Sequence, residues 1–466
     1  MLALIMGAQL MMILDTSIIT TALPRLVQDL GFRAADLSWV QNVYVLAFGG
    51  LLLLGARAGD LIGRRRVFVI GVAVFAAASL LAGVATSAPI FLLARTFQGV
   101  ASAFAIPSTL ALLVSVYPQP HQRGRAIAIY SAVIGAGASV GIILGGVFTD
   151  VLSWRWGLLI NVPIGLVVII LAPRFLQETA GRRGRFDLLG ALLITVGMTS
   201  LVFGLIEASA VGWTSAVVIG ALLAAAVLLI AFVIVERRSR EPVIPLELFA
   251  SVTRSGAYIA RLLVVGAGFS LFYFLSQYLQ NVLGFSALLA GLSYIPLTGM
   301  FFATVYGVAP LTRLLGRELL LVLALVVAIS GMLWLSTAGA STAYFPGVAL
   351  PLLLIGLGQG TAIILLTQAG MEGVAAGQSG AGSGLINTAH QLGGSIGLAI
   401  LAGVFVAVGG DSGSVGAQID GFAVVYRIAS GFYMLAAFVG IVMLVAVRPK
   451  GREALRKRPS DTGQRN

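Results

Sequence analysis

The segment GARAGDLIGRRRVF, residues 55–68, is a short charged stretch between two long apolar runs. It contains Asp60 and four arginines, whereas the flanking runs, residues 43–54 and 67–81, carry no charge. Lys and Arg next to membrane spans are retained on the cytoplasmic side, because carrying them across the bilayer is unfavourable. We therefore place residues 55–68 in a cytoplasmic loop between the second and third spans and count the topology outward from it.

The overall composition is that of a multi-span membrane protein. Of 466 residues, 59% are hydrophobic and 10% are charged, and the mean hydropathy is +1.03, far from soluble globular values. The net charge of +12 comes from short clusters between apolar runs rather than from one basic face, so we expect no nucleic-acid partner.

Several kinds of chemistry are excluded by the residues that the sequence contains. It has no Cys, which rules out disulfides, thiol catalysis and Cys-ligated metals, and its two histidines, His121 and His390, make a histidine-rich metal site unexpected. The sequence has no P-loop of the G-x-x-x-x-G-K-[ST] type and no visible nucleophile and base set. We therefore expect neither a cofactor nor enzymatic activity.

The apolar runs predict an all-α integral membrane protein with about fourteen transmembrane helices, since about twenty apolar residues cross the hydrocarbon core. The expected spans are residues 2–23, 38–56, 67–87, 90–116, 125–149, 156–173, 188–208, 213–235, 256–280, 288–309, 318–337, 346–367, 383–408 and 421–447. An even number of spans puts both termini on one side. With residues 55–68 in the cytoplasm, about 23 Lys and Arg lie on that side and four on the other, as the positive-inside rule requires. Both termini are therefore predicted to be cytoplasmic.

Two longer polar connections, residues 174–187 and 236–255, bracket spans seven and eight and predict a 6+2+6 arrangement. Repeated halves are common in transporters, and the substrate site then lies near the midplane between them. We expect an N-terminal six-helix bundle over residues 1–175, an inserted two-helix hairpin with flanking loops over 176–255, a C-terminal six-helix bundle over 256–447 and a basic cytoplasmic tail over 448–466.

Asp15 in the first span and Arg95 in the fourth are charged residues inside apolar runs, where charge is unfavourable and points to function by default. Counting 1.5 Å per residue from the span ends puts both in the outer half, close enough to pair if the two spans are neighbours. A carboxylate that alternates between a desolvated site and an Arg partner is suited to taking up and releasing a proton. Proton coupling is our hypothesis for this pair; the alternatives are a structural hydrogen bond for Asp15 and a snorkelling side chain for Arg95.

Polar and aromatic side chains in other spans are candidates for a substrate cavity, because stacking and adaptable packing suit large, apolar or cationic molecules. The alternative is that they are core or lipid-facing residues. The candidates lie in spans four, nine, ten, twelve and thirteen: Gln98, Tyr273, Gln277, Tyr294, Gln359, Asn387 and His390.

Glycines at a spacing of four residues mark span five. Gly137, Gly141 and Gly145 follow this spacing and Gly146 lies next to the last of them. Such a stripe lets helix backbones approach closely, and tight packing alone is enough to account for it.

At these residues the chain resembles the fourteen-span drug:proton antiporters of the major facilitator superfamily. The similar segments are LDTSIITTALP at 14–24, GDLIGRRR at 59–66, ARTFQG at 94–99, WRWGLLINVPIG at 154–165, RFDLLG at 185–190 and NTAHQLGGSIG at 387–397. The resemblance implies a transporter that exports drugs, dyes or antibiotics in exchange for protons by alternating access. Its partners would be the small-molecule substrate, protons and membrane lipids, and it would work as a monomer.

The resemblance also implies roles for single residues. Asp15 would be the proton-coupling or cation-recognising acid and Arg95 its relay partner. A conformational latch would consist of the loop residues Gly59, Asp60, Gly63, Arg64 and Arg65.

Because Arg greatly outnumbers Lys, which occurs only at positions 450 and 457, we expect a GC-rich bacterial gene and a multi-pass protein of the bacterial inner (plasma) membrane.

Three departures from the family pattern keep other functions open. Ile142 stands where the antiporter motif has Pro, His390 stands where an Arg is expected, and no further intramembrane acid is evident in the second half. A single acid favours a simple stoichiometry and a neutral, monocationic or zwitterionic cargo. A proton symporter or uniporter of a metabolite is the main alternative, and a receptor that transports nothing is the second.

Overall fold

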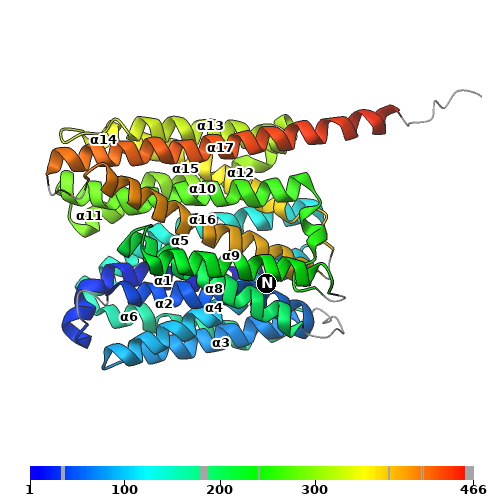
Figure 1. Cartoon of the computed structure of the whole chain (residues 1–466), viewed down its shortest axis with the longest axis horizontal. Coiled ribbons are helices and arrows are strands. Elements are labelled where there is room, and N and C mark those ends of the chain that lie inside the picture. The colour runs from blue at the N-terminus through cyan, green and yellow to red at the C-terminus, as the bar shows by residue number, and fades with distance from the viewer. Residues whose placement is uncertain are drawn as a thin grey trace, which may run out of the picture.

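The computed structural model is an all-helical bundle and describes residues 1–32, 37–178, 187–239, 242–375, 378–410, 412 and 414–456. Its long helices run side by side (Figure 1). The helices are α1 (Leu2–Leu30), α2 (Leu37–Ile62), α3 (Arg64–Gly83), α4 (Ala88–Val116), α5 (Pro120–Val147), α6 (Trp154–Leu159), α7 (Asn161–Phe175), α8 (Leu188–Val211), α9 (Ala216–Glu236), α10 (Val252–Gln277), α11 (Ala287–Leu292), α12 (Ile295–Leu315), α13 (Arg317–Leu335), α14 (Tyr344–Gly347), α15 (Ala349–Gly370), α16 (Ser379–Ala407) and α17 (Val415–Arg456).

The predicted spans coincide with these helices. In the part of the chain that the structure describes, 13 segments are long and apolar enough to cross a membrane. The remaining predicted span, residues 125–149, lies on α5, a helix of 28 residues that is about 42 Å long at 1.5 Å per residue. The prediction of an all-helical multi-pass protein is therefore confirmed.

Two of the predicted spans are broken by proline. The sixth span consists of α6 and α7, and the tenth consists of α11 and α12. Pro163 lies four residues after the last residue of α6, and Pro296 lies four residues after the last residue of α11. A proline has no N–H for the bond to the carbonyl four residues earlier, and its ring clashes with that carbonyl. Each break falls at the carbonyl that the proline leaves without its helical donor.

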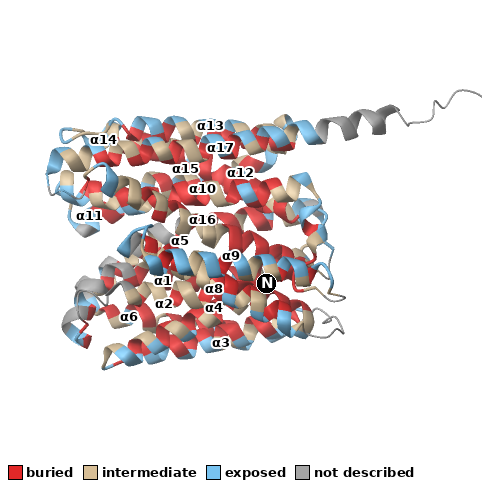
Figure 2. Ribbon diagram, in the orientation of Figure 1, coloured by how far each residue is buried: buried red, intermediate tan, exposed pale blue. Residues whose placement is uncertain are grey.

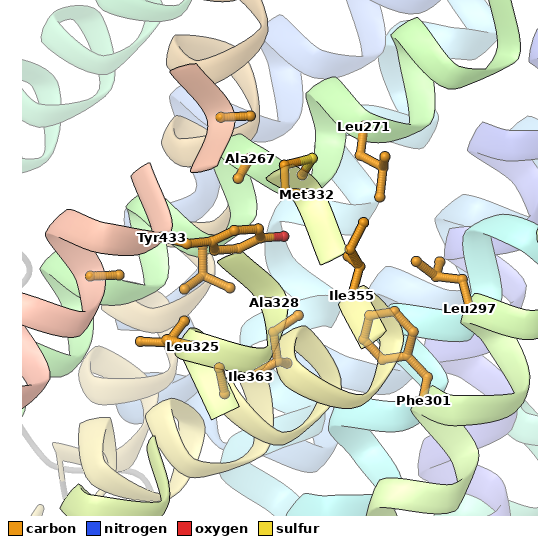
Figure 3. Close-up of a cluster of buried hydrophobic side chains, with 14 of the residues drawn as sticks. Ala267, Leu271, Leu297, Phe301, Leu325, Ala328, Met332, Ile355, Ile363 and Tyr433 are labelled. Atoms are coloured by element: carbon orange, nitrogen blue, oxygen red, sulfur yellow. The ribbon is translucent and has the colours of Figure 1, made fainter. Parts of the chain in front are cut away.

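The long helices gather into two groups, each with its own hydrophobic core that also includes a few residues of the other group. In Figure 1 helices α10, α13 and α17 lie in the upper part of the view and α1 to α4 in the lower part. One core is built mainly by α10–α17; in it, Tyr433 of α17 reaches toward Met332 and Ala328 of α13 (Figure 3). The other core is built mainly by α1–α7. Burial is concentrated on the helix faces that point toward neighbours (Figure 2).

The helices α8 and α9 pack against each other, and α8 also contacts α2 and α16, one from each group. Only 17% of the most apolar stretch of α9 is buried inside the protein. A helix that is apolar all round and yet exposed is suited to contact with lipid. This geometry agrees with an inserted hairpin, although the domain boundaries themselves stay a prediction.

The connections α2–α3, α4–α5, α12–α13 and α15–α16 meet at one end of the bundle, which we call the basic end. Hydrogen bonds and ion pairs join them: Asp60 accepts from Gly380, Gln368 donates to Gly124, and Arg317 pairs with Glu372. This is the end at which the sequence collects its arginines. Positive-inside retention predicts that it faces the cytoplasm.

The chain end differs from expectation in one respect. The sequence predicts a tail that begins at residue 448, but α17 continues as a helix to Arg456. Helix formers such as Glu453, Ala454 and Leu455 follow Pro449 and Gly451 in this stretch. Residues 457–466 lie outside the described part of the chain.

Candidate functional site

Asp15 stands at the centre of a hydrogen-bonded network between α1, α4 and α7. Its Oδ2 pairs with the Arg95 guanidinium, and its Oδ1 accepts hydrogen bonds of 2.8 Å from both Gln98 Nε2 and Asn161 Nδ2. All four side chains have 0% exposure. A buried carboxylate is tolerated only when its charge and lone pairs are matched in this way. Asp15 and Arg95 therefore do pair, as their positions in the sequence suggested.

Arg95 is held by α2 as well as by its own helix. Its Nε donates to Val40 O at 3.2 Å, its Nη1 donates to Gln98 Oε1 at 2.7 Å, and its guanidinium carbon lies 4.7 Å from the centre of the Tyr44 ring. Its Nη2 has no hydrogen-bond partner among the described residues. Cation–π contact in a desolvated site is worth about 2 kcal/mol. The arginine does not snorkel to the surface, because its whole side chain lies inside the protein.

A glycine lets α2 and α4 approach closely enough to build this site. A Cβ on Gly99 would lie 2.5 Å from the backbone oxygen of Tyr44, a distance that side chains essentially never show. Gly99 is one helical turn from Arg95, so the close approach brings the Tyr44 ring over the guanidinium. Tyr44 Oη in turn donates to Ser102 Oγ at 2.9 Å.

The predicted latch residues meet a helix end from the other group of helices. Asp60 Oδ1 and Oδ2 each accept a 3.1 Å hydrogen bond, from the backbone N–H groups of Gly380 and Ala381 respectively. These groups lie in the first turn of α16, where the N–H groups lack helical partners and the helix dipole favours an anion. Arg64 Nη2 also pairs with Asp60 at 2.9 Å. Asp60 thus joins α2 to α16 at the basic end.

The rest of the predicted latch ties the same loop to the end of α7. Arg65 donates from its backbone N to Glu178 Oε1 at 3.1 Å and from Nη1 to the carbonyl of Leu176 at 3.1 Å. Gly63 has a φ of +112°, a conformation that favours glycine, and a Cβ there would lie 2.7 Å from Glu178 Oε1. A Cβ on Gly59 would lie 3.3 Å from Ser108 Oγ.

Three further contacts join the two groups of helices near the basic end. Ser383 Oγ donates to Pro107 O at 2.7 Å, linking α16 to α4. Ser131 Oγ donates to Thr367 Oγ1 at 3.3 Å, linking α5 to α15. Gln368 Nε2 donates to Gly124 O at 3.3 Å. Together with Asp60, these contacts join the two groups of helices near the basic end.

The aromatic candidates for a substrate cavity are in different surroundings. Tyr294 is buried, donates to Phe272 O at 2.8 Å and stacks on the Phe272 ring with centroids 5.0 Å apart, so it belongs to the packing of the second group. Tyr273 is 50% exposed. Gln277 is the last residue of α10 and is partly exposed.

The amide and histidine candidates come closer to the boundary between the groups. Gln359 is buried against Gly268, and its Oε1 has no hydrogen-bond partner among the described residues. Asn387 is buried and donates to Ser383 O at 2.9 Å. His390 is partly exposed and contacts Arg261. Gln98, which was predicted for the cavity, instead binds Asp15.

The glycine stripe of α5 faces α1. A Cβ on Gly137 would lie 2.8 Å from Ile13 Cγ2, and one on Gly141 would lie 2.5 Å from Ser17 Cβ. Gly145 is buried. The surroundings of Gly146 lie outside what the structure describes.

The sequence analysis missed two groups of polar residues. Asn161 and Ser79 complete the Asp15 network, with Gln98 Nε2 and Asn161 Nδ2 donating to Ser79 Oγ at 2.8 and 3.3 Å. Asn161 lies in the segment at 154–165 that resembles the family, but an uncharged amide gives no electrostatic signal. Arg261 lies nine residues into α10 and is 1% exposed; a charged residue inside an apolar run was the signal that could have found it.

The fold and this site define a class of protein: a multi-pass membrane transporter built from two groups of helices that meet along an interface. The Major Facilitator Superfamily profile matches residues 5–196 and 188–398. The chain therefore belongs to the major facilitator superfamily, whose members are transporters and not enzymes.

Curated relatives place it near antibiotic resistance and export proteins. The chain is 37% identical to the puromycin resistance protein pur8 of Streptomyces alboniger over 459 residues, covering 96% of this chain and 89% of that protein. It is 40% identical to the cephamycin export protein CmcT of Amycolatopsis lactamdurans over 418 residues, covering 89% and 86%. The crystal structure of the human organic anion transporter MFSD10 has the same fold, with a TM-score of 0.66 at 17% identity over 94% of this chain and 98% of that one.

Proposed function

We propose that this protein exports small amphipathic molecules, such as drugs, dyes or antibiotics, in exchange for protons. The names of its relatives support the cargo class, since one confers puromycin resistance and another exports cephamycin. The observation that carries the proton-coupling part is the fully buried pair of Asp15 and Arg95 inside a membrane-spanning bundle. Intramembrane acids of this kind typically mark proton pathways in transporters.

The network around Asp15 supports a switch between two states. In the conformation described, the carboxylate is matched by Arg95, Gln98 and Asn161. Protonation of Asp15 would remove its negative charge and so release the guanidinium, whose Nη2 has no partner here. The energy available is large, because breaking one side of a buried ion pair changes stability by about 3–5 kcal/mol. A proton taken from outside would thus favour return to the state open to the cytoplasm.

Alternating access would move two halves against each other. We assign the moving halves to residues 1–175 and 256–447, the hairpin to residues 176–255 and the tail to residues 448–466. Asp60 with Gly380 and Ala381 would act as a latch that stabilises the state closed at the basic end. α4 carries Arg95 and also contacts Ser383 through Pro107, so it offers a mechanical link between the proton site and the latch.

The relatives and the basic end also support a cellular location and a set of partners for this activity. The relatives are from Streptomyces and Amycolatopsis, which supports a bacterial plasma membrane with the basic end in the cytoplasm. Protons, cargo and lipids would be the partners of a functional monomer. A proton symporter or uniporter for a metabolite is the second candidate, favoured by Ile142 in place of the antiporter motif's proline.

The test is cargo-driven proton movement in everted membrane vesicles. Respiration acidifies the vesicle lumen, puromycin or a lipophilic dye is added, and loss of the pH gradient is followed with acridine orange. Wild-type protein should release protons on addition of cargo, and Asp15→Asn should abolish this release. Asp420→Asn removes an exposed acid on α17 and should behave as wild type. Retained cargo-driven proton release in Asp15→Asn would refute the assignment.

A further inference from the structure

Arg261 is a buried cation without an acidic partner. Its side chain is 1% exposed, and none of the ion pairs among the described residues includes it. A charge in a membrane interior is unfavourable unless an ion pair, backbone carbonyl groups or a ligand compensate it. Arg95, which is buried to the same degree, has such a partner in Asp15. Arg261 has only neutral acceptors among the described residues, so its charge would be compensated better by an anion.

The hydrogen bonds of Arg261 leave one edge of the guanidinium, formed by Nε and Nη2, with a single long contact. Nη1 donates to Ile363 O at 3.1 Å and to Thr367 Oγ1 at 2.6 Å. Nη2 has a contact of 3.4 Å to His390 Nδ1, at the long limit for a hydrogen bond. Nε has no partner in the described structure. The Nε and Nη2 hydrogens point in parallel from the same edge, and this edge binds the two oxygens of a carboxylate.

Arg261 lies near the boundary between the two halves. Thr367, which orients Nη1, is itself contacted by Ser131 of α5. The Tyr130 hydroxyl on the same helix lies near Arg261, Thr109 and Asn387, and it makes no hydrogen bond of standard geometry among the described residues. Separation of α5 from α15 at the basic end would therefore expose the guanidinium from that side. His390 is partly exposed and covers Arg261 next to the ring of Phe269, which it meets edge to face at 5.7 Å.

We propose that Arg261 is a binding site for the carboxylate of an anionic or zwitterionic cargo, with Thr367 and His390 orienting the guanidinium and the Tyr130 hydroxyl donating across the interface. The Phe269 ring supplies an apolar contact for the body of such a molecule. This inference rests on the proposed export function but concerns recognition alone, and it adds molecules that carry a planar oxyanion on an apolar body to the classes of cargo.

The test compares two probes that differ only in charge, 2-naphthoate and its amide, 2-naphthamide. Equilibrium binding of both is measured to the full-length protein in nanodiscs of neutral lipid. Wild-type protein should bind the carboxylate more tightly than the amide. Arg261→Gln should weaken binding of the carboxylate by about 10- to 100-fold, the effect of losing a charge-assisted hydrogen bond, and change binding of the amide by less than about 3-fold.

Two controls separate recognition from folding. Arg427→Gln removes an exposed arginine on α17 and should leave both affinities unchanged. If Arg261→Gln does not fold, Arg261→Lys retains the charge and should keep a preference for the carboxylate, although a smaller one. Equal wild-type affinity for the two probes, equal losses in Arg261→Gln, or displacement of 2-naphthoate by equimolar chloride would each overturn the proposal. Because binding needs no proton gradient, these outcomes are independent of the proton-exchange test.

Discussion

The Asp60→Asn substitution tests the latch at the basic end. In the structure, the two Asp60 oxygens accept N–H groups from Gly380 and Ala381, both at 3.1 Å. An Asn keeps one acceptor, turns an NH2 group toward the other N–H and removes the charge from the helix end. The ion pair with Arg64 lies within one half, so its loss affects both conformations and does not enter the difference between them.

The magnitude follows from the contacts that cross the interface. One hydrogen bond to a charged group contributes about 1.5–3 kcal/mol, and a charge at a helix N-terminus contributes about 0.3–1 kcal/mol. We therefore expect Asp60→Asn to shift the equilibrium by about 2–4 kcal/mol toward the state open at the basic end. This corresponds to a roughly 30- to 900-fold change in the population ratio.

The sequence lacks Cys, so a single reporter thiol has no background. Ser131→Cys places it between α5 and α15, where Ser131 is 1% exposed. Its rate of alkylation by a maleimide reports the open population, and this rate should rise at least about 10-fold when Asp60→Asn is added. Asp420→Asn, on the exposed face of α17, should not change it. An unchanged rate in the Asp60 variant would refute the latch.

Three further substitutions probe the packing that supports the site. Asn161→Ala removes one donor to Asp15 and should lower stability by about 1.5–3 kcal/mol, measured as a lower melting temperature in detergent; no change would mean that the bond contributes nothing. Gly141→Ala creates a contact of 2.5 Å with Ser17 and should cost about 1–3 kcal/mol, and Ser17→Gly in the same chain should restore the melting temperature. Gly63→Ala combines a φ of +112° with a contact of 2.7 Å to a carboxylate oxygen, and it should slow transport more than Gly284→Ala, a glycine with φ of +70° and no nearby atoms.

Hydropathy and charge predicted the fold well, because the bilayer constrains helix length and loop charge more strongly than water constrains a soluble chain. All the expected spans lie on helices. The breaks at Pro163 and Pro296 were not predicted, since a run of apolar residues has the same mean hydropathy whether or not a proline interrupts its hydrogen bonds.

The charged residues of the Asp15 network could be predicted from the sequence, whereas its neutral partner Asn161 could not. Asp15 and Arg95 stood out as charges in apolar runs, and their depths along antiparallel spans placed them together. The sequence did not identify the partner of Asp60, because nothing local indicates that Gly380, 320 positions later, lies next to it. Asn161 contributes through a neutral amide, which hydropathy does not distinguish from an ordinary polar residue.

The most direct test of proton-driven export is uphill transport by the purified protein in proteoliposomes. A radiolabelled cargo, such as puromycin, is placed at equal concentration on both sides, and a pH gradient is imposed with no other energy source. Proton antiport predicts that cargo moves toward the acidic compartment, that reversing the gradient reverses the movement, and that Asp15→Asn only lets cargo equilibrate. Movement toward the alkaline compartment would indicate symport, and equal concentrations under either gradient would contradict proton coupling altogether.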